Sequence, residues 1–353
     1  MTNDEIQALF TPRVLTTSAR NIEEEINRND PLLLTGKLGR NVESQATNTI
    51  TFEIEEATYN LAPLSYVGAP AVNVNIGRNR TPYTVTPPQI FLKDMLTASE
   101  MEHVRMAGQN PINMTSSDKG SAYNQLIAVK QQGLSRLINR RIEWLFAQTM
   151  RGKIDFTSEQ GRQFTFDFKL PNAVNIGTDY WNTSANADPI KHLRALAKQF
   201  MSINNQLAPD FIVMGSAAAD AFINNSEVKE WMRSQGQQIY QSSVVLAGGN
   251  AQVIGNLYGA DLYEYSARYQ DSKGKEQSYL DDNYVYMTNS SLWRLFYGAI
   301  YDYDAGNPPI VVGSRFSKMK STEDGKAMNI YIESHPLPIV FSNSAVLKAK
   351  VIN

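Results

Sequence analysis

The sequence predicts an α+β fold in which one lobe is inserted into another. Apolar and polar residues alternate strictly from residue 50 to 55, as in a half-buried strand. One unusually long helical pattern follows at about 118–150, and a mixture of helices and strands occupies 190–312. Because strand patterns return after that mixture, we expect the first lobe to be discontinuous.

Composition excludes several classes of protein. The chain has 353 residues, enough for about two domains, and no cysteine, so it holds no disulfide and no thiolate site. Its 33 basic and 35 acidic residues give a net charge of −2, which argues against a polyelectrolyte binder. The longest apolar runs are too short to cross a bilayer, and Asp4 and Glu5 stand where a secretory signal carries positive charge. We therefore expect synthesis in the cytoplasm.

The first forty residues contain little that predicts a core. The run 21–27 is polar almost all round, so we expect this segment to lie on something else or to fray. The strand pattern then begins, with Ile50, Phe52 and Ile54 on one face.

The stretch from Ala57 to Pro88 has too many prolines and glycines to form a helix. Its flanks, the strand at 50–54 and the run 83–92, are expected to pair as an antiparallel ribbon with an apolar tip. Such a tip needs a partner surface. An ordinary meander packed on its own domain is an equally open interpretation.

The strongest helical signal runs from about Asp118 to Met150. Apolar residues recur at spacings of three, four and seven, Asp118 or Ser117 is a suitable cap, and Gly152 is a suitable stop. A helix of that length measures about 50 Å and acts as a strut. Gly133 weakens it by roughly 1 kcal/mol relative to alanine.

The rest of the chain predicts a hairpin, an inserted lobe and a returning sheet. Phe156 and the residues 164–168 flank a turn, and Asp188 with Pro189 opens a second helix. Within the lobe we expect strands at 211–214, 244–246, 253–254 and 262–265, with short helices after Ser216 and Ser226. Strands at 315–320, 328–333 and 339–341 are expected to pack with the hairpin.

No pattern supports catalysis, a cofactor or a metal, so we assign no catalytic, cofactor or metal residues. His103, His192 and His335 lie far apart in the sequence. The segment 302–307 has two aspartates spaced as in a calcium loop but lacks the later acidic ligands, which favours a plain turn. The arginines at 78 and 80 and at 140 and 141 are pairs and not patches, so nucleic-acid binding by them is a minor possibility.

The order of these parts resembles a known family of virus shells. The stretches that carry the resemblance are Pro209 to Gly215, Tyr258 to Tyr263, Tyr279 to Val285 and Glu333 to Val340. In this order and in these stretches the chain is similar to the major capsid proteins of tailed bacteriophages with the HK97-like fold, and within them to the lambda-type head proteins. One departure is Asp281, where the family commonly has proline.

The resemblance implies a head protein that forms hexamers and pentamers, and then an icosahedral shell around double-stranded DNA. It implies an N-terminal arm at 1–48, an extended loop at 49–95, a spine helix with the first part of a peripheral domain at 96–189, an axial domain at 190–312 and the second peripheral part at 313–353. The loop would lie across a neighbouring subunit. The implied contact residues are Tyr59, Tyr66, Ile76, Arg78, Arg80 and Tyr83, the arginines by charge pairing.

The resemblance also implies partners. A separate scaffolding protein is expected because only about 40 residues precede the first strand, and a portal protein, a decoration protein and packaged DNA are further candidates. Since no lysine lies between Ala57 and Leu92, we expect no lysine crosslink in the loop. The alternatives are a bacterial nanocompartment shell of the same fold and, from another class, a monomeric β-rich hydrolase or ligand-binding protein.

Overall fold

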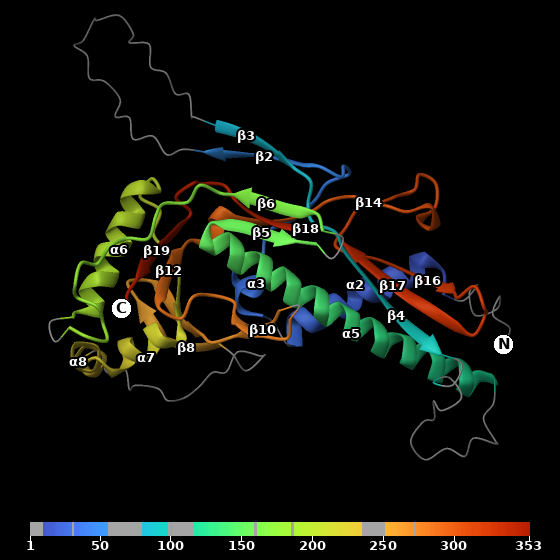
Figure 1. The fold of residues 1–353 in the computed structure, drawn as a ribbon, viewed down its shortest axis with the longest axis horizontal. Coiled ribbons are helices and arrows are strands. Elements are labelled where there is room, and N and C mark those ends of the chain that lie inside the picture. The colour runs from blue at the N-terminus through green and yellow to red at the C-terminus, as the bar shows by residue number, and fades with distance from the viewer. Residues whose placement is uncertain are drawn as a thin grey trace, which may run out of the picture. The chain divides into compact units, whose positions relative to one another are not determined.

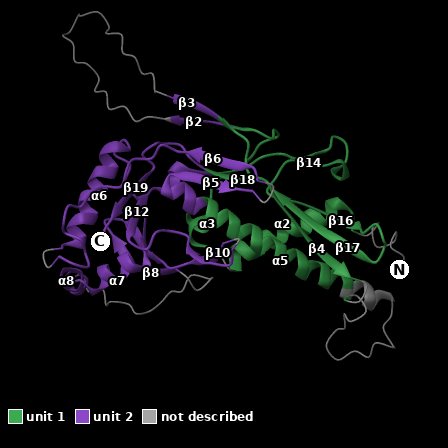
Figure 2. Ribbon diagram, viewed as in Figure 1, with its two compact units in different colours: residues 1–50, 84–145, 295–338 green, residues 51–83, 146–294, 339–353 purple. Residues whose placement is uncertain are grey.

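The computed structural model describes residues 10–29, 32–55, 80–97, 100, 116–158, 161–184, 187–234, 251–271 and 273–353 (Figure 1). The chain folds as two compact units (Figure 2). Unit 1 comprises residues 1–50, 84–145 and 295–338, and unit 2 comprises 51–83, 146–294 and 339–353. Each unit is therefore built from three separate stretches of chain. The five-part division expected from the sequence stays a prediction.

Unit 1 contains an antiparallel three-stranded sheet in the order β16-β17-β4. Its strands are β4 (Ile90–Thr97), β16 (Phe316–Ser321) and β17 (Ala327–Ser334). The alternation expected at 328–333 is present, because Met328, Ile330 and Ile332 are buried on one face. The turn at 323–326 joins β16 to β17, and Gly325 supplies its positive φ of 67°.

The N-terminal helix α2 (Pro12–Asn29) packs on this sheet, at strand β16. The Thr16 hydroxyl donates to the Ser317 carbonyl at 3.2 Å and accepts from the Ser317 amide at 3.0 Å. The expectation that this segment lies on something else is confirmed for residues 12–29, which form a helix that lies on the sheet. The polar run 21–27 suggests a helix without core contacts, yet Glu23 within that run is buried against Arg315.

The predicted long helix is confirmed as α5 (Ser116–Arg151), 36 residues long (Figure 1). Its side chains are described from residue 123 onward, and those that face the interior include Ile127, Leu134 and Ile138. The short helix α3 (Leu33–Leu38) begins at the carboxylate of Glu143, a buried residue of α5. A distant side chain thus replaces the local cap that Leu32 cannot supply.

Unit 2 is organised around a five-stranded sheet in the order β19-β12-β7-β9-β8, in which only β7 and β9 run parallel. The strands are β7 (Phe211–Gly215), β8 (Ala251–Leu257), β9 (Ala260–Tyr265), β12 (Tyr284–Thr288) and β19 (Val346–Lys350). The helices are α6 (Pro189–Ile203), α7 (Ser216–Asn224) and α8 (Ser226–Ser234). As predicted, the Asp188 side chain caps α6 by accepting from the Lys191 amide at 2.9 Å.

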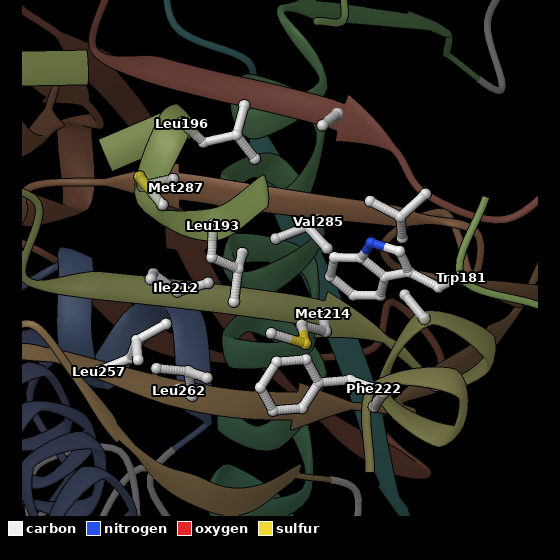
Figure 3. Close-up of a cluster of buried hydrophobic side chains, with 14 of the residues drawn as sticks. Trp181, Leu193, Leu196, Ile212, Met214, Phe222, Leu257, Leu262, Val285 and Met287 are labelled. Carbon is white, nitrogen blue, oxygen red and sulfur yellow. The ribbon is translucent and has the colours of Figure 1, made fainter. Parts of the chain in front are cut away.

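The core of unit 2 lies between this sheet and its helices, as Figure 3 shows. Leu193 of α6 and Phe222 of α7 are fully buried beside Ile212 and Met214 of β7. Every residue of β7 is buried, which explains why its sequence is an unbroken apolar run. The strand expected at 244–246 lies outside the described residues.

Two strand pairings differ from the expectation. The run 83–92 is split, because β3 (Arg80–Val85) pairs with β2 (Ile50–Glu55) whereas β4 pairs with β17. The two prolines 87 and 88 lie between β3 and β4 and separate them. The hairpin of β5 (Lys153–Thr157) and β6 (Gln163–Asp167) is confirmed, but it forms its own two-stranded sheet and does not pair with β16 or β17.

The remaining strands are short. A three-stranded sheet in the order β1-β13-β18 consists of β1 (Val42–Ser44), β13 (Trp293–Tyr297) and β18 (Pro336–Val340). Two small hairpins consist of β10 (Arg268–Gln270) with β11 (Glu276–Ser278) and β14 (Ile300–Tyr301) with β15 (Ile310–Val311). The 3₁₀ turns are η2 (Ser290–Leu292) and η3 (Tyr303–Ala305).

Candidate intersubunit surface

Two of the six predicted contact residues, Arg80 and Tyr83, lie on β3, the second strand of the ribbon. The predicted residues Tyr59, Tyr66, Ile76 and Arg78 lie outside the described residues. The structure therefore defines the base of the ribbon, where β2 and β3 pair, and the assignment of its tip stays a prediction.

Arg80 forms an ion pair within its own chain. Its Nη1 lies 3.2 Å from Oε2 of Glu53 on β2, and both side chains are about half exposed, at 49% and 51%. An exposed pair of this kind contributes at most about 1 kcal/mol. About half of the Arg80 side-chain surface is exposed and can be covered by a further contact.

Tyr83 belongs to an aromatic cluster that fixes the ribbon base. Its ring stacks on Phe52 of β2 at 5.8 Å between centroids, and the edge of Phe166 on β6 meets both rings at 5.9 Å. Phe168 adds a fourth ring at 4.8 Å from Phe166. Ring pairs in such geometry contribute about 0.5–1.5 kcal/mol each beyond area burial. The hairpin β5–β6 thus anchors the ribbon through side chains without pairing to it.

Unit 1 exposes a second set of apolar side chains that sequence reasoning missed. On β4, Phe91 and Met95 are both 49% exposed, and Phe91 stacks on Tyr331 of β17 at 5.6 Å. In the stretch 300–312, Tyr301 and Tyr303 are 53% and 94% exposed. Exposed apolar groups gathered on one unit are typical of an interface. The sequence does contain one sign of these exposed groups, the apolar run 310–312 that follows the prolines 308 and 309.

The turn at 302–307 is held by lysines. Lys318 of β16 pairs with both Asp302 and Asp304, the latter at 2.9 Å, and Lys320 lies 2.8 Å from Asp304. Hydrogen bonds from Lys320 and Lys318 lower the pKa of Asp304. Burial lowers the pKa of Lys318, but its bonds to Asp302 and Asp304 outweigh burial and leave that pKa raised. The lysine ammonium groups thus pair with the two carboxylates that are spaced as in a calcium loop, and residues 303–305 form the turn η3.

The two described histidines are each hydrogen-bonded to neighbouring groups of the chain. His192 accepts a hydrogen bond from Trp181 Nε1 at 3.1 Å. His335 is buried, with Nδ1 at 3.0 Å from the Ala299 carbonyl and Nε2 at 3.0 Å from Glu333. Within the described part of the chain, no group of three or more acidic or histidine side chains is arranged to hold a metal ion. His103 lies outside it.

Among the described helices, none combines the length and the apolar character that crossing a membrane requires.

Comparisons with known proteins agree with this architecture. The family model for phage major capsid protein E matches residues 11–351. The crystal structure of the putative capsid protein of a prophage from E. coli CFT073 is 18% identical, with a TM-score of 0.65 over 91% of this chain and 93% of that one.

Two further structures share the fold. A phage-related protein from Bordetella bronchiseptica RB50 is 11% identical, with a TM-score of 0.51 over 96% of both chains. The capsid protein of cyanophage P-SCSP1u is also 11% identical, with a TM-score of 0.50 over 90% of this chain and 88% of that one. No curated protein matches the chain in sequence.

These findings decide between the hypotheses drawn from the sequence. The fold is the HK97-like capsid fold, with mixed helices and sheets, which confirms the predicted class. The family model describes structural proteins of the phage virion. It does not describe a monomeric hydrolase or ligand-binding protein. With a match that spans nearly its whole length, the chain belongs to the phage major capsid protein E family.

Proposed function

We propose that this chain forms hexamers and pentamers that close into an icosahedral phage head around double-stranded DNA. The observation that carries the proposal is the family match over residues 11–351. The fold shared with the prophage capsid protein over nine tenths of both chains supports it. The role is architectural, without a catalytic step, and the chain is made in the host cytoplasm before it enters the virion.

The ribbon supplies one contact between subunits in this proposal. Phe52, Tyr83 and Phe166 fix its base within unit 2. Arg80 pairs with Glu53, both side chains are about half exposed, and a carboxylate of a neighbouring subunit can join this pair. The contacts of Tyr59, Tyr66, Ile76 and Arg78 would follow along the same segment.

The exposed apolar side chains of unit 1 supply a second contact. Met95 and Tyr303 are too exposed to stabilise the isolated chain, and burying them against another subunit is favourable at about 25 cal/mol per Å². Stability of the assembled shell then comes in part from surface that a single chain cannot cover. A scaffolding protein, a portal protein and a decoration protein are the further partners of such a shell.

The first test is electron microscopy and light scattering of the purified chain, co-expressed with the scaffolding protein of its phage. We expect closed particles of uniform diameter. Deleting Ala62 to Thr81 should leave unit 2 folded, by circular dichroism, and abolish particles. A chain that stays a monomer of about 40 kDa under all conditions would contradict the proposal, and particles filled with enzyme cargo would identify a nanocompartment.

A further inference from the structure

The three-stranded sheet of unit 1 has two edge strands, β16 and β4, and the chain covers the edge at β16. The Thr16 hydroxyl of α2 bonds to both the amide and the carbonyl of Ser317. Just before β16, Arg20 Nε donates to the Arg315 carbonyl at 3.3 Å. Unpaired edge strands tend to bind further strands, so proteins cover or block them. Helix α2 does this for β16.

The same contacts show which backbone groups of β4 face outward. Because Ser317 turns its amide and carbonyl to α2, its partner Ile332 turns those groups to β4, where it pairs with Leu92. Successive residues of a strand alternate in this respect. Leu92 therefore bonds to β17, whereas the amides and carbonyls of Phe91 and Lys93 point to the outer edge.

Side chains block the outer edge at the end of β4. The Met95 amide donates to Asp94 at 2.8 Å, and the Met95 carbonyl accepts from Lys130 Nζ at 3.2 Å. The Thr97 amide donates to Glu100 at 2.9 Å. Lys130 also forms ion pairs with Asp94 and Glu100, at 3.4 and 3.0 Å, which hold this arrangement together. No strand can bond to these outward groups without displacing it.

The start of β4 is not blocked in this way. Among the described residues, none hydrogen-bonds to the outward amide or carbonyl of Phe91 or Lys93. Both side chains are exposed, Phe91 at 49%. Before the strand come Pro87 and Pro88, which have no N–H to offer a further strand. We call Phe91 and Lys93 the open edge of β4.

We propose that the open edge pairs with the open edge of a second copy of the chain, antiparallel about a two-fold axis at Leu92. This inference rests on the proposed function, in which copies meet in a shell, and it adds a contact that the ribbon does not make. In this register Phe91 of each copy lies opposite Lys93 of the other, and each such pair exchanges two backbone hydrogen bonds. The two three-stranded sheets then continue as one.

The occupant is a second copy because the two ends of the edge complement each other. In the proposed register Thr97 lies opposite Pro87 of the other copy. The Thr97 amide is already bonded within its own chain, and Pro87 has no N–H to leave unpaired, so neither end loses a hydrogen bond. On the exposed face, each Phe91 ring lies beside a Lys93 ammonium of the other copy, which is a favourable cross-strand pair.

The test uses single cysteines in the full-length chain. The natural chain has no cysteine, so a single introduced one can form a disulfide only between copies. In the proposed register Leu92 faces Leu92 of the other copy, with Cα atoms about 4.5 Å apart, which is within disulfide range. Leu92→Cys should therefore give a disulfide-linked dimer after mild oxidation, measured by non-reducing electrophoresis.

Lys93→Cys is the matched control. Lys93 is exposed whereas Leu92 is half-buried, so chance collisions would crosslink Lys93→Cys more readily. In the proposed register, however, the two copies of Lys93 are diagonal neighbours about 7–8 Å apart, beyond the usual disulfide range. Leu92→Cys should therefore crosslink faster than Lys93→Cys.

A second pair of variants tests the backbone hydrogen bonds. Added to Leu92→Cys, Lys93→Pro removes an outward N–H and leaves the bonds to β17 in place, which circular dichroism should confirm. Two bonds are lost across the axis, so crosslinking should slow roughly 30-fold at concentrations where most chains are monomers. Lys93→Val also removes the charge but keeps the N–H, and it should crosslink at the rate of Leu92→Cys alone.

Crosslinking of Lys93→Cys as fast as that of Leu92→Cys would overturn the proposal. An unchanged rate with Lys93→Pro, or an equal loss with Lys93→Val, would also overturn it. Particle formation is scored separately by electron microscopy. Particles of Leu92→Cys that contain no disulfide would contradict the pairing and leave the shell function standing, whereas a natural chain that forms no particles would contradict the shell function alone.

Discussion

Glu143 and Thr35 are joined by two hydrogen bonds to a single oxygen. The Thr35 amide and the Thr35 hydroxyl both donate to Oε2 of Glu143, at 2.7 and 2.6 Å. The Leu34 amide donates to the other oxygen at 2.8 Å. A fully buried carboxylate is tolerated here because the first turn of α3 offers it three donors.

Replacing Glu143 with alanine should therefore destabilise unit 1 strongly. The substitution leaves the Leu34 and Thr35 amides buried without an acceptor, at a cost of about 3 kcal/mol in the free energy of unfolding. Urea denaturation of the unassembled chain measures this loss. Glu143→Gln keeps one acceptor and should cost less, and equal losses for the two variants would contradict the argument.

The buried ion pair of Glu23 and Arg315 gives a second prediction. Arg315 is fully buried, its Nε lies 3.3 Å from Oε2 of Glu23, and Asn139 accepts from its Nη2. Arg315→Met leaves a buried carboxylate without its cation and should cost about 3–5 kcal/mol. Adding Glu23→Leu should recover part of that loss in a double-mutant cycle, whereas strictly additive losses would show that the pair is not coupled.

Stability should depend on pH through Asp304. Its pKa in the folded chain is lowered from 3.8 by hydrogen bonds from Lys320 and Lys318. A carboxyl group with a lowered folded pKa contributes stability above its unfolded pKa, and the contribution disappears as pH falls through the folded value. The thermal midpoint should thus exceed that of Asp304→Asn near neutral pH, and the difference should shrink as pH falls below about 3.8 and vanish below the lowered folded pKa. A difference that persists in stronger acid would exclude this pair as its source.

Two glycines should respond to alanine in opposite directions. At Gly215 an added Cβ would lie 2.4 Å from the Asp281 carbonyl oxygen, so Gly215→Ala must displace backbone. At Gly133, inside α5, it would meet nothing within 4 Å, and Gly133→Ala should stabilise the helix by up to about 1 kcal/mol. Urea midpoints of the unassembled chain compare them, and a destabilised Gly133→Ala would mean that this position has a role besides helix propensity.

Local patterns predicted the local elements. The periodicity of α5, the cap Asp188 and the alternation of Ile50, Phe52 and Ile54 each depend on neighbours a few residues away, and each is confirmed. The pairing of β4 with β17 and the burial of Glu23 depend on partners more than 200 residues distant. No short window of the sequence contains both partners, so local patterns cannot predict these contacts.

The candidate site was predictable to a similar extent. Tyr83 could be placed on a ribbon strand because the strand pattern at 50–55 requires a partner, whereas Arg80 was expected before that strand and lies at its start. The exposed side chains Phe91 and Met95 of β4 could not be predicted, because the pairing that sets the exposed face of β4 is with β17, far along the chain.

The edge strand β19 has a consequence for synthesis of the chain. It occupies residues 346–350 and pairs with β12, while unit 1 needs residues up to 338 to pair with its first segments. Neither unit can therefore close until its last strands have left the ribosome, after most of the chain has been made. A product that stops before residue 327 lacks strands of both units.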